Sequence, residues 1–316
     1  MKHFVATAIL AGALALPALA IAADYTIMAP AGPGGGWDQT ARAMQEAMTA
    51  EGISGNVQVV NVPGAGGTIG LAQFAQQAAG KPDQLIVGGY VMVGAILTNK
   101  APVTLDAVTP IARLTGEFEV IVVPAASDIQ TLADLVAKLK ADPGAVSWAG
   151  GSAGGTDHIT AGLFAKTAGV DPKFVNYVAF SGGGEALAAV LGSQVTVGIS
   201  GYGEFQAQVE AGALRVIGVS SPERIAVIDG PTFKEGGVDL TVMNWRGVWA
   251  GPGLTAEQVA AISADIEKVV NSASWKATLE TKGWLNTYLA GDDFKATLAT
   301  EITATEAVLK EIGLVQ

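Results

Sequence analysis

Short apolar runs along the chain alternate with longer segments in which apolar residues recur every three or four positions. Residues 57–60 and 84–88 have the length and composition of buried parallel strands, and helical spacing over residues 68–79 lies between them. A strand, a helix and a second strand in this order form a βαβ unit. The same alternation begins earlier, where residues 25–28 precede a helical pattern over residues 39–50. The pattern therefore predicts an α/β fold.

The second half of the chain repeats this alternation as a fresh α/β unit. Its expected strands and helices, in chain order, are residues 146–148, 157–168, 174–178, 185–191 and 195–200. Two β-like segments, one containing Val120 and the other Leu214, are expected to cross between the halves. Long helices are expected at residues 255–272 and 292–311, packed back onto the first half.

This order of elements predicts two lobes joined by two crossover strands that serve as a hinge. We expect domain 1 to comprise residues 23–122 and 226–316, and domain 2 to comprise residues 123–225. Ligands of open α/β sheets bind at the carboxyl ends of the strands, so a ligand is expected between the lobes.

Four glycine-rich turns stand where an expected strand passes into an expected helix, at residues 29–38, 61–70, 149–158 and 180–185. The first turns of a helix leave backbone N–H groups unpaired, and the helix dipole adds positive potential there, which favours an anion. Glycines also serve simply as tight turns in α/β folds. Four such turns in one chain favour the binding of an anionic ligand over that simpler explanation.

The N-terminus has the features of a secretory signal peptide. Lys2 and His3 precede an apolar run over residues 4–16, and small residues alternate up to Ala22. We expect residues 1–22 to be removed after Ala22 and the mature chain to be exported. A membrane anchor is the alternative, but the apolar run is short for a membrane span.

The composition excludes several classes of function. Among the 316 residues there is no cysteine, so no disulfide, thiolate metal site or cysteine nucleophile can form. A net charge of −11 with scattered Lys and Arg argues against nucleic acid. HExxH and a complete phosphate-loop signature are missing, and Ser152 with His158 lacks a third member for a hydrolase. We therefore expect no catalytic residue, no metal, no cofactor and no enzymatic activity. A nucleotide-dependent oxidoreductase, suggested by the glycines of residues 32–36, is disfavoured in an exported protein.

Several stretches carry a resemblance to a known family. They are P-A-G-P-G-G-G-W-D (30–38), N-V-P-G-A-G-G-T-I-G (61–70), A-D-P-G-A-V-S-W-A-G-G-S-A-G-G-T-D-H (141–158), Y-V-A-F-S-G-G-G-E-A-L (177–187), L-R-V-I-G-V-S-S-P-E-R (214–224), P-T-F-K-E-G-G (231–237) and W-R-G-V-W-A-G-P-G (245–253). In order and spacing they resemble the solute-binding proteins of tripartite tricarboxylate transporters, the TctC/Bug family. The resemblance covers nearly the whole mature chain.

The resemblance implies a monomeric two-lobed periplasmic binding protein of type II, which closes like a Venus flytrap. It implies capture of a small carboxylate, with di- and tricarboxylates such as citrate first, for delivery to the permease subunits of the transporter. A periplasmic sensor that feeds a signalling system would use the same ligand chemistry. The chain departs from the family in the Gly-Trp of its first turn, which is closer to the citrate branch. It also lacks an Asp in residues 199–202.

The resemblance also implies which residues hold the ligand, largely through backbone amides, hydroxyls and bridging waters. Those of the first lobe are Gly34, Gly35, Gly36, Trp37, Gly64, Ala65, Gly66 and Gly67. Those of the second lobe are Ser152, Gly155, Thr156, Phe180, Ser181 and Gly182.

Several of these positions admit a structural explanation as well. Trp37 is expected either at the floor of the cleft or in the core. Thr156 is a possible helix cap, although a cap at the cleft also presents its hydroxyl to a ligand. Tyr90 and Tyr202 are added as residues at the rim of the cleft, with core packing an equal alternative. Asp38 is expected to cap the helix that follows the first turn.

Overall fold

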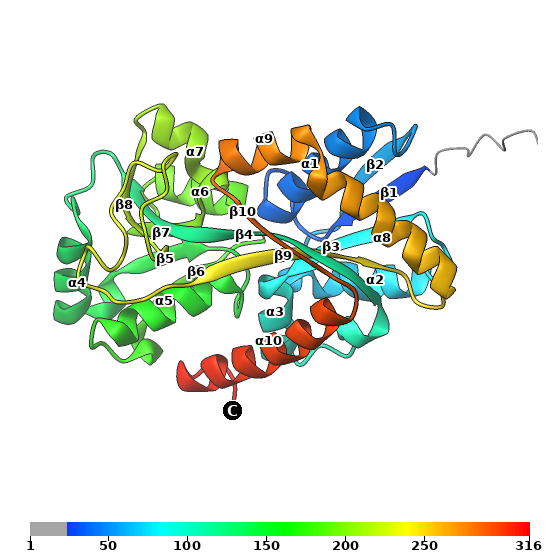
Figure 1. The fold of residues 1–316 in the computed structure, drawn as a ribbon. Helices are drawn as coiled ribbons and strands as arrows, with labels where there is room; N and C mark the ends of the chain where they lie inside the picture. The colour runs from blue at the N-terminus through cyan, green and yellow to red at the C-terminus, as the bar shows by residue number, and fades with distance from the viewer. Residues whose placement is uncertain (1–23, 182) are drawn as a thin grey trace, which may run out of the picture.

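The computed structural model describes residues 24–181 and 183–316, so the expected signal peptide, residues 1–22, lies outside the described residues. Within the described residues one mixed ten-stranded sheet runs through both halves of the molecule (Figure 1). Its strand order is β2-β1-β3-β9-β4-β7-β5-β6, and β10 and β8 also pair with β4. This is the predicted α/β architecture of two lobes joined by a hinge.

The first lobe lies on the right in Figure 1. Its parallel strands β1, β2 and β3 are followed by the antiparallel strand β9. Its strands are β1 (Tyr25–Ala29), β2 (Val57–Asn61), β3 (Gln84–Gly89), β9 (Met243–Ala250) and β10 (Leu285–Ala290). Its helices are α1 (Gly36–Ala50), α2 (Thr68–Gln77), α3 (Tyr90–Asn99), α8 (Ala256–Asn271), α9 (Ala273–Lys282) and α10 (Gly291–Glu311).

The second lobe lies on the left in Figure 1 and repeats the parallel arrangement with β7, β5 and β6. Its strands are β5 (Ser147–Gly150), β6 (Asn176–Ala179), β7 (Val197–Gly201) and β8 (Leu214–Val219). Its helices are α4 (Leu132–Ala141), α5 (Thr156–Thr167), α6 (Gly183–Leu191) and α7 (Tyr202–Glu210).

A single long strand, β4 (Thr109–Pro124), belongs to both lobes. It pairs with β9 as far as Phe118 and with β7 from Glu119 onward. The sequence predicted the Val120 segment as one crossover, and β4 is that crossover. The second crossover was expected at the Leu214 strand, but β8 pairs only with the second-lobe end of β4. The chain returns to the first lobe in the segment that leads into β9.

Each lobe is built on its own aromatic core. In the first lobe three buried rings pack with centroids 5.6 to 6.4 Å apart: Trp245, Trp249 and Phe294. In the second lobe Phe164 lies 5.7 and 5.3 Å from two other buried rings, those of Trp148 and Phe233. Burial of each such side chain contributes about 1.5–3 kcal/mol, so each lobe has the means to hold its own shape while the hinge moves.

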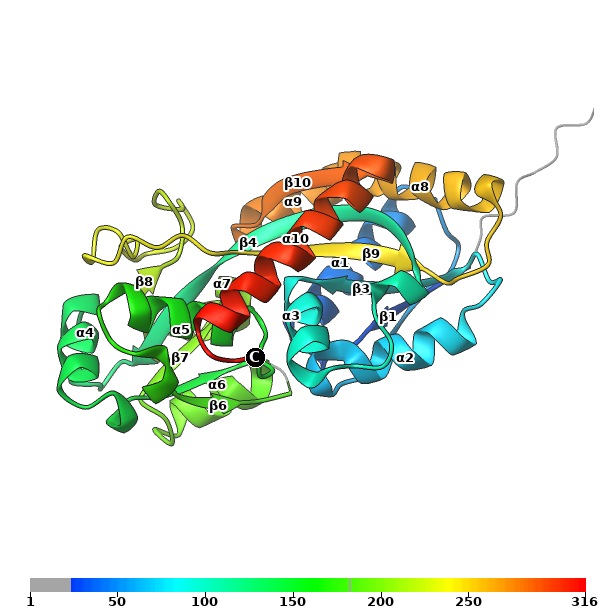
Figure 2. The ribbon, with the colours of Figure 1, turned by 90° about the horizontal axis from the view of Figure 1, so that it is seen from below.

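Helix α10 starts in the first lobe, where it packs against α3 and β4, and ends against the second lobe (Figure 2). Leu309 and Ile312 join Ile159 of α5 in a small buried cluster. Lys166 of α5 also pairs with Glu311, although both side chains are half exposed. The sequence predicted that this helix packs on the first lobe, and its last turn therefore makes an additional contact between the lobes.

The start of helix α1 differs from the expected capping. The N-cap of α1 is Gly35, because Asp38 lies one turn inside the helix. The Asp38 carboxylate instead accepts the N–H of Gly34 at 2.9 Å and pairs with Arg42 at 2.9 Å. The Asp38 carboxylate thus links the glycine-rich turn to the first turn of the helix.

None of the helices in residues 24–181 and 183–316 has the length and hydropathy to cross a membrane.

Candidate ligand-binding cleft

A cavity opens between the two lobes at the N-termini of the helices that follow the glycine-rich turns. Its empty space, including open solvent at the mouth, is about 570 Å³. The first lobe lines it with Pro30, Ala31, Gly35, Gly36, Trp37, Gly64, Gly66, Gly67, Val91, Asn244 and Arg246. The second lobe lines it with Gly151, Ser152, Gly155, Asp157, Ser181, Gly183, Ser200 and Glu204.

All four glycine-rich turns reach this one cavity. Nine of the residues proposed from the sequence line it: Gly35, Gly36, Trp37, Gly64, Gly66, Gly67, Ser152, Gly155 and Ser181. The glycines allow close approach, because a Cβ on Gly67 would lie 2.6 Å from the Trp37 ring. Trp37 is only 6% exposed and also lines the cavity, so it satisfies both of the alternatives considered for it.

Other proposed residues lie just outside the cavity lining. Gly34, Ala65 and Phe180 belong to the same turns as lining residues, while Gly182 lies outside the described residues. Tyr202 is 4% exposed and packs in the core of the second lobe.

Tyr90 and Thr156 are held by other parts of the protein. Tyr90 packs against the cluster at the end of α10. Thr156 is fully buried, and its hydroxyl lies 3.2 Å from Oδ1 of Asn244, which lines the cavity. The structure therefore places Thr156 directly behind a cavity residue.

In three of the four glycine-rich turns, a backbone N–H group donates a hydrogen bond to a carboxylate of the chain itself. Each of these carboxylates belongs to the start of the helix that follows the turn. The pairs are Gly34 N with Asp38 at 2.9 Å, Gly151 N with Asp157 at 2.6 Å, and Ser181 N with Glu185 at 3.1 Å. Such bonds satisfy helix N-termini and favour negative charge there. The anion-binding capacity expected from the glycine pattern is thus partly used within the protein.

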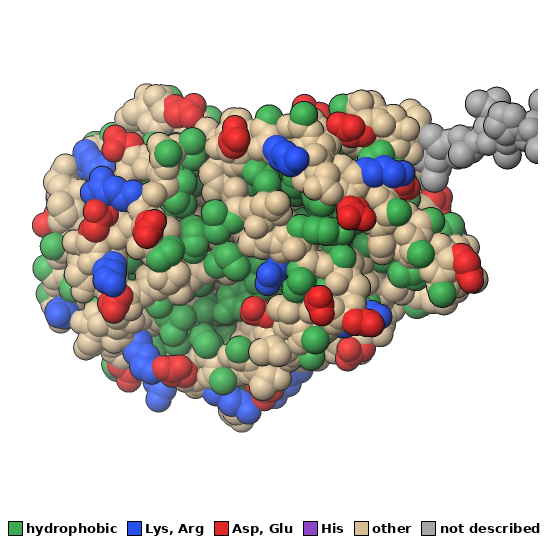
Figure 3. Space-filling view, in the orientation of Figure 1, with side chains coloured by type: hydrophobic (Ala, Val, Ile, Leu, Met, Phe, Trp, Pro, Cys, Tyr) green, Lys and Arg blue, Asp and Glu red, His purple; other side chains and the backbone are tan. Residues whose placement is uncertain are grey.

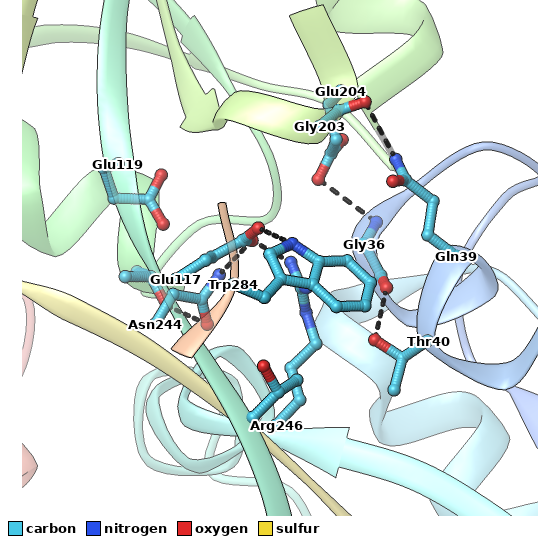
Figure 4. A network of polar contacts seen from close by, with 12 residues as sticks. Gly36, Gln39, Thr40, Glu117, Glu119, Gly203, Glu204, Asn244, Arg246 and Trp284 are labelled. Carbon is cyan, nitrogen blue, oxygen red and sulfur yellow. Dashed lines mark hydrogen bonds and ion pairs between the residues drawn. The ribbon is translucent and has the colours of Figure 1, made fainter. Parts of the chain in front are cut away.

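One backbone amide at the N-terminus of α1 donates a hydrogen bond to a carboxylate of the opposite lobe. Gly36 N donates to Glu204 Oε1 at 3.1 Å, and Glu204 lies on the first turn of α7 (Figure 4). Gln39 of α1 also reaches across, with its side-chain amide 3.3 Å from the carbonyl oxygen of Gly203. The two lobes are therefore in polar contact at the edge of the cavity.

A buried ion pair stands at the hinge between the lobes. Arg246 of β9 pairs with Glu117 of β4, and both side chains are at most 5% exposed. Trp284 Nε1 donates to Glu117 Oε2 at 2.7 Å, and the guanidinium lies 5.1 Å from the Trp284 ring centroid (Figure 4). Nη1 of Arg246 is buried without a partner among the described residues. An unpaired buried donor of a charged group is costly, so an acceptor from a ligand would stabilise it.

Three further acids lie in or behind the cavity. Burial raises the pKa of Glu204 to about 8, and the charges of Asp157 and Glu117 act in the same direction. Burial also raises the pKa of Asp157 to about 6, although the Gly151 N–H opposes the shift. The pKa of Glu119 is raised well above its usual value by burial and by the neighbouring carboxylates. Both Glu119 oxygens lack a donor, so a protonated Glu119 is the form that this site accommodates.

Sequence reasoning missed Arg246, Glu117 and Glu204. A signal for the first two was present, because Glu117 and Glu119 directly precede the apolar run of residues 120–123 and Arg246 stands between two tryptophans. Charged residues inside buried strands require partners, which marks them for attention. Glu204 carries no comparable signal in the sequence.

The arrangement does not assemble a hydrolase. Residues 150–154 have the Gly-x-Ser-x-Gly spacing, but within the described residues no hydrogen bond joins Ser152 to His158. His158 stacks on Tyr177 with ring centroids 4.1 Å apart, and its Nδ1 accepts the N–H of Gly154 at 3.2 Å. Burial lowers its pKa to about 4, so it is a neutral structural side chain. Over the described ranges, no group of three or more His, Asp or Glu residues is arranged to hold a metal ion.

Comparison with known proteins gives a consistent result. The family model "Tripartite tricarboxylate transporter family receptor" (TctC) matches residues 40–314. Protein BugT of Bordetella pertussis is 25% identical over 292 residues, which cover 91% of this chain and 88% of that protein. MatC from Rhodopseudomonas palustris with bound malate has a TM-score of 0.80 at 24% identity and covers 90% of this chain and 98% of its own. An R. palustris protein with adipate has a TM-score of 0.81 at 22% identity and covers 92% and 97%.

Proposed function

Because the chain belongs to the family of tripartite tricarboxylate transporter receptors, we propose that it captures a small carboxylate between its lobes and delivers it to the membrane subunits of such a transporter. The family consists of periplasmic substrate-binding receptors and not of enzymes, which removes the oxidoreductase alternative. A sensor that hands the same ligand to a signalling system remains the second candidate, since it would use the same cavity.

The observation that carries the proposal is the composition of the cavity wall. Glycine-rich turns from both lobes converge on it, and Arg246 lines it with a buried Nη1 that has no acceptor within the described chain. A carboxylate bound to Arg246 and to backbone amides forms charge-assisted hydrogen bonds, each worth roughly 1.5–3 kcal/mol. A few such bonds supply the roughly 8 kcal/mol that micromolar binding requires.

The proposal extends to where and how the protein acts. We infer export through the signal peptide of residues 1–22, function as a monomer and no nucleic-acid partner. Lys and Arg are interspersed with Asp and Glu on the face drawn in Figure 3, which supports the absence of a basic binding patch. The neighbours in structure hold malate and adipate, so these dicarboxylates are candidates beside citrate.

A thermal-shift screen tests this proposal. The mature protein is heated with millimolar malate, adipate, citrate, glutarate, glutamate or 4-aminobutyrate, and with glucose as a neutral control. A ligand present at about a hundred times its Kd stabilises the folded state by about 2.7 kcal/mol, which raises Tm by several degrees. We expect at least one carboxylate to do so and glucose to leave Tm unchanged. A response to glucose alone, or to none of the acids, would contradict the proposal.

A further inference from the structure

Glu204 occupies an unusual place for an acid in a protein that captures acids. Glu204 belongs to the second lobe, but its carboxylate accepts a hydrogen bond from the N–H of Gly36 in the first lobe. Gly36 is one of the residues that were expected to bind the ligand. Arg246, Asp157 and Glu204 are the charged residues among the described lining of the cavity. Because Arg246 is already paired with Glu117, the acids facing the cavity have no cation of their own.

We propose that the ligand carries a positively charged group beside its carboxylate, and that Glu204, supported by Asp157, selects that group. The proposal rests on the proposed function, because it names the class of carboxylate that the same cavity accepts. The chemistry is that of a small zwitterion, with one ammonium or guanidinium group and at least one carboxylate.

The carboxylate of the ligand has a separate place to bind. Nη1 of Arg246 is buried and lacks an acceptor among the described residues, while Nη2 pairs with Glu117. Both ends of the expected ligand meet near Gly36: a Cβ added to this glycine would lie 2.1 Å from Arg246 Nη2, and its N–H already holds Glu204. A single small ligand can therefore reach Arg246 and Glu204 at the same time.

A second carboxylate in place of the cation would meet like charges at any pH where these acids are ionised. Glu204 and Asp157 face the cavity, and Glu117 lies behind them at the hinge. A buried carboxylate without a partner is strongly unfavourable, and one next to other carboxylates is worse. A cation at the same position pairs with these acids. The cavity thus distinguishes an ammonium from a carboxylate by the sign of its charge.

The pH dependence of binding has opposite signs for the two kinds of ligand. The groups that face Glu204 are Asp157 of α5, Glu117 and Glu119 of β4, Tyr177 of β6 and Arg246 of β9. Burial raises the pKa of Glu204 to about 8, helped by the charges of Asp157 and Glu117 and opposed by Arg246 and by a hydrogen bond from Ser200. The empty protein therefore holds Glu204 protonated below that pH. A cationic ligand favours the ionised acid and releases the proton, so its affinity rises as pH increases from 6 to 8.5. A dicarboxylate favours the protonated acid, so its affinity falls over the same range.

Four probes of similar size separate the charges. Isothermal titration calorimetry compares butyrate, glutarate, 4-aminobutyrate and glutamate, which carry one acid, two acids, one acid with an ammonium, and two acids with an ammonium. The pH series uses 4-aminobutyrate and glutarate, because an ammonium like that of lysine titrates near 10 and carboxylic acids titrate near 4. We expect the two ammonium compounds to bind at least tenfold more tightly than glutarate. We also expect proton release on binding, seen as a heat that depends on the buffer.

The variant Glu204→Gln removes the charge and keeps the shape. It is expected to weaken binding of 4-aminobutyrate and glutamate at least tenfold, to improve binding of glutarate, and to flatten the pH dependence. Glu210→Gln is the matched control, because Glu210 lies on the same helix, is exposed and is not a cavity residue. It should bind all probes as the wild type does.

The outcomes separate this inference from the proposed function. Tighter binding of glutarate, malate or adipate than of any ammonium compound would overturn the inference and leave carboxylate capture intact. An affinity for 4-aminobutyrate that is independent of pH, or unchanged in Glu204→Gln, would also overturn it. Binding of no carboxylate at all would instead contradict the proposed function. If Glu204→Gln fails to fold, the pH series on the wild-type protein provides the test. An affinity for 4-aminobutyrate that rises with pH supports the inference, and one that falls overturns it.

Discussion

At the scale of single residues, Thr156 shows how a fully buried side chain can influence a ligand it does not touch. Its hydroxyl lies 3.2 Å from Oδ1 of Asn244, and Asn244 Nδ2 lies 3.5 Å from Oε1 of Glu117. Asn244 lines the cavity next to Arg246. Thr156 therefore orients the polar wall of the cavity from behind, as a positioning residue.

The substitution Thr156→Val tests this role. Valine keeps the volume but leaves Asn244 Oδ1 without a donor in a buried site, which costs about 1–3 kcal/mol. We expect a lower Tm and a several-fold weaker affinity for the best carboxylate of the screen, measured by calorimetry. Thr156→Ser retains the hydroxyl and should restore the affinity. An affinity equal to wild type in Thr156→Val would show that Asn244 is held without it.

At the scale of elements, the turn at residues 151–155 and helix α3 are packed so closely that only glycine fits between them. A Cβ on Gly94 of α3 would lie 2.0 Å from the carbonyl oxygen of Gly154. The neighbouring turn of the first lobe is also in close contact, since a Cβ on Gly66 would lie 3.3 Å from Cβ of Ser152. The small residues of these elements therefore determine how far the lobes can approach.

The variant Gly94→Ala is predicted to hold the two lobes apart. A backbone oxygen cannot move aside as a flexible side chain does, so the second-lobe turn must retreat from α3. Ligand affinity is expected to fall at least tenfold, while circular dichroism remains unchanged because alanine favours the helix. Gly55→Ala is the control, since its Cβ would meet nothing within 4 Å. Wild-type affinity in Gly94→Ala would mean that closure does not use this contact.

The elements that the sequence predicted well are those set by local patterns. The glycine-rich turns and the helices after them are local, and so is the apolar periodicity of α1, α2, α8 and α10. The sequence indicated the part of β4 around Val120 but not the continuous strand, because Thr115, Gly116 and Glu117 interrupt the apolar run of the strand. Their compatibility with a buried strand comes from distant partners, above all Arg246, 129 positions away. A pattern of near neighbours does not contain that information.

The same limit applies to the candidate site. Backbone amides in glycine-rich turns can be located from the sequence, because their function depends on the turn itself. The partner of the Gly36 amide is Glu204, 168 positions later and in the other lobe. Tyr202 illustrates the opposite case, since its place in the second-lobe core follows from how α7 packs rather than from its position after β7. Side chains that act across a cleft become visible only when the lobes are assembled.

At the scale of the whole molecule, three connections join the lobes away from the cavity. Strand β4 and the segment entering β9 cross at the hinge, and the last turn of α10 packs on α5 (Figures 1 and 2). The first two are covalent and remain in place during any motion. The third consists of side-chain contacts around Ile312, which can form and separate. We therefore interpret the end of α10 as a latch that favours the closed arrangement.

Ile312 is the residue to change, because its side chain is 3% exposed and would lie 3.1 Å from a Cβ on Gly162 of α5. Replacing a buried Ile by Ala costs about 2–5 kcal/mol where the residue stays buried in every state. If the contact separates on opening, part of that cost falls on the closed state alone. Ile312→Ala should then enlarge the radius of gyration of the free protein in small-angle X-ray scattering. It should also weaken ligand affinity at least fivefold, which corresponds to about 1 kcal/mol.

The liganded form of Ile312→Ala should regain the radius of gyration of the liganded wild type, because a bound ligand compensates for the lost contact by mass action. Lys310→Ala provides the control, since that side chain is exposed and forms its ion pair with Glu306 of the same helix. A variant that melts earlier but keeps both the free radius and the affinity would identify the end of α10 as plain packing. The distinction matters for transport, because a latch that opens readily lets the receptor release its ligand to the membrane subunits.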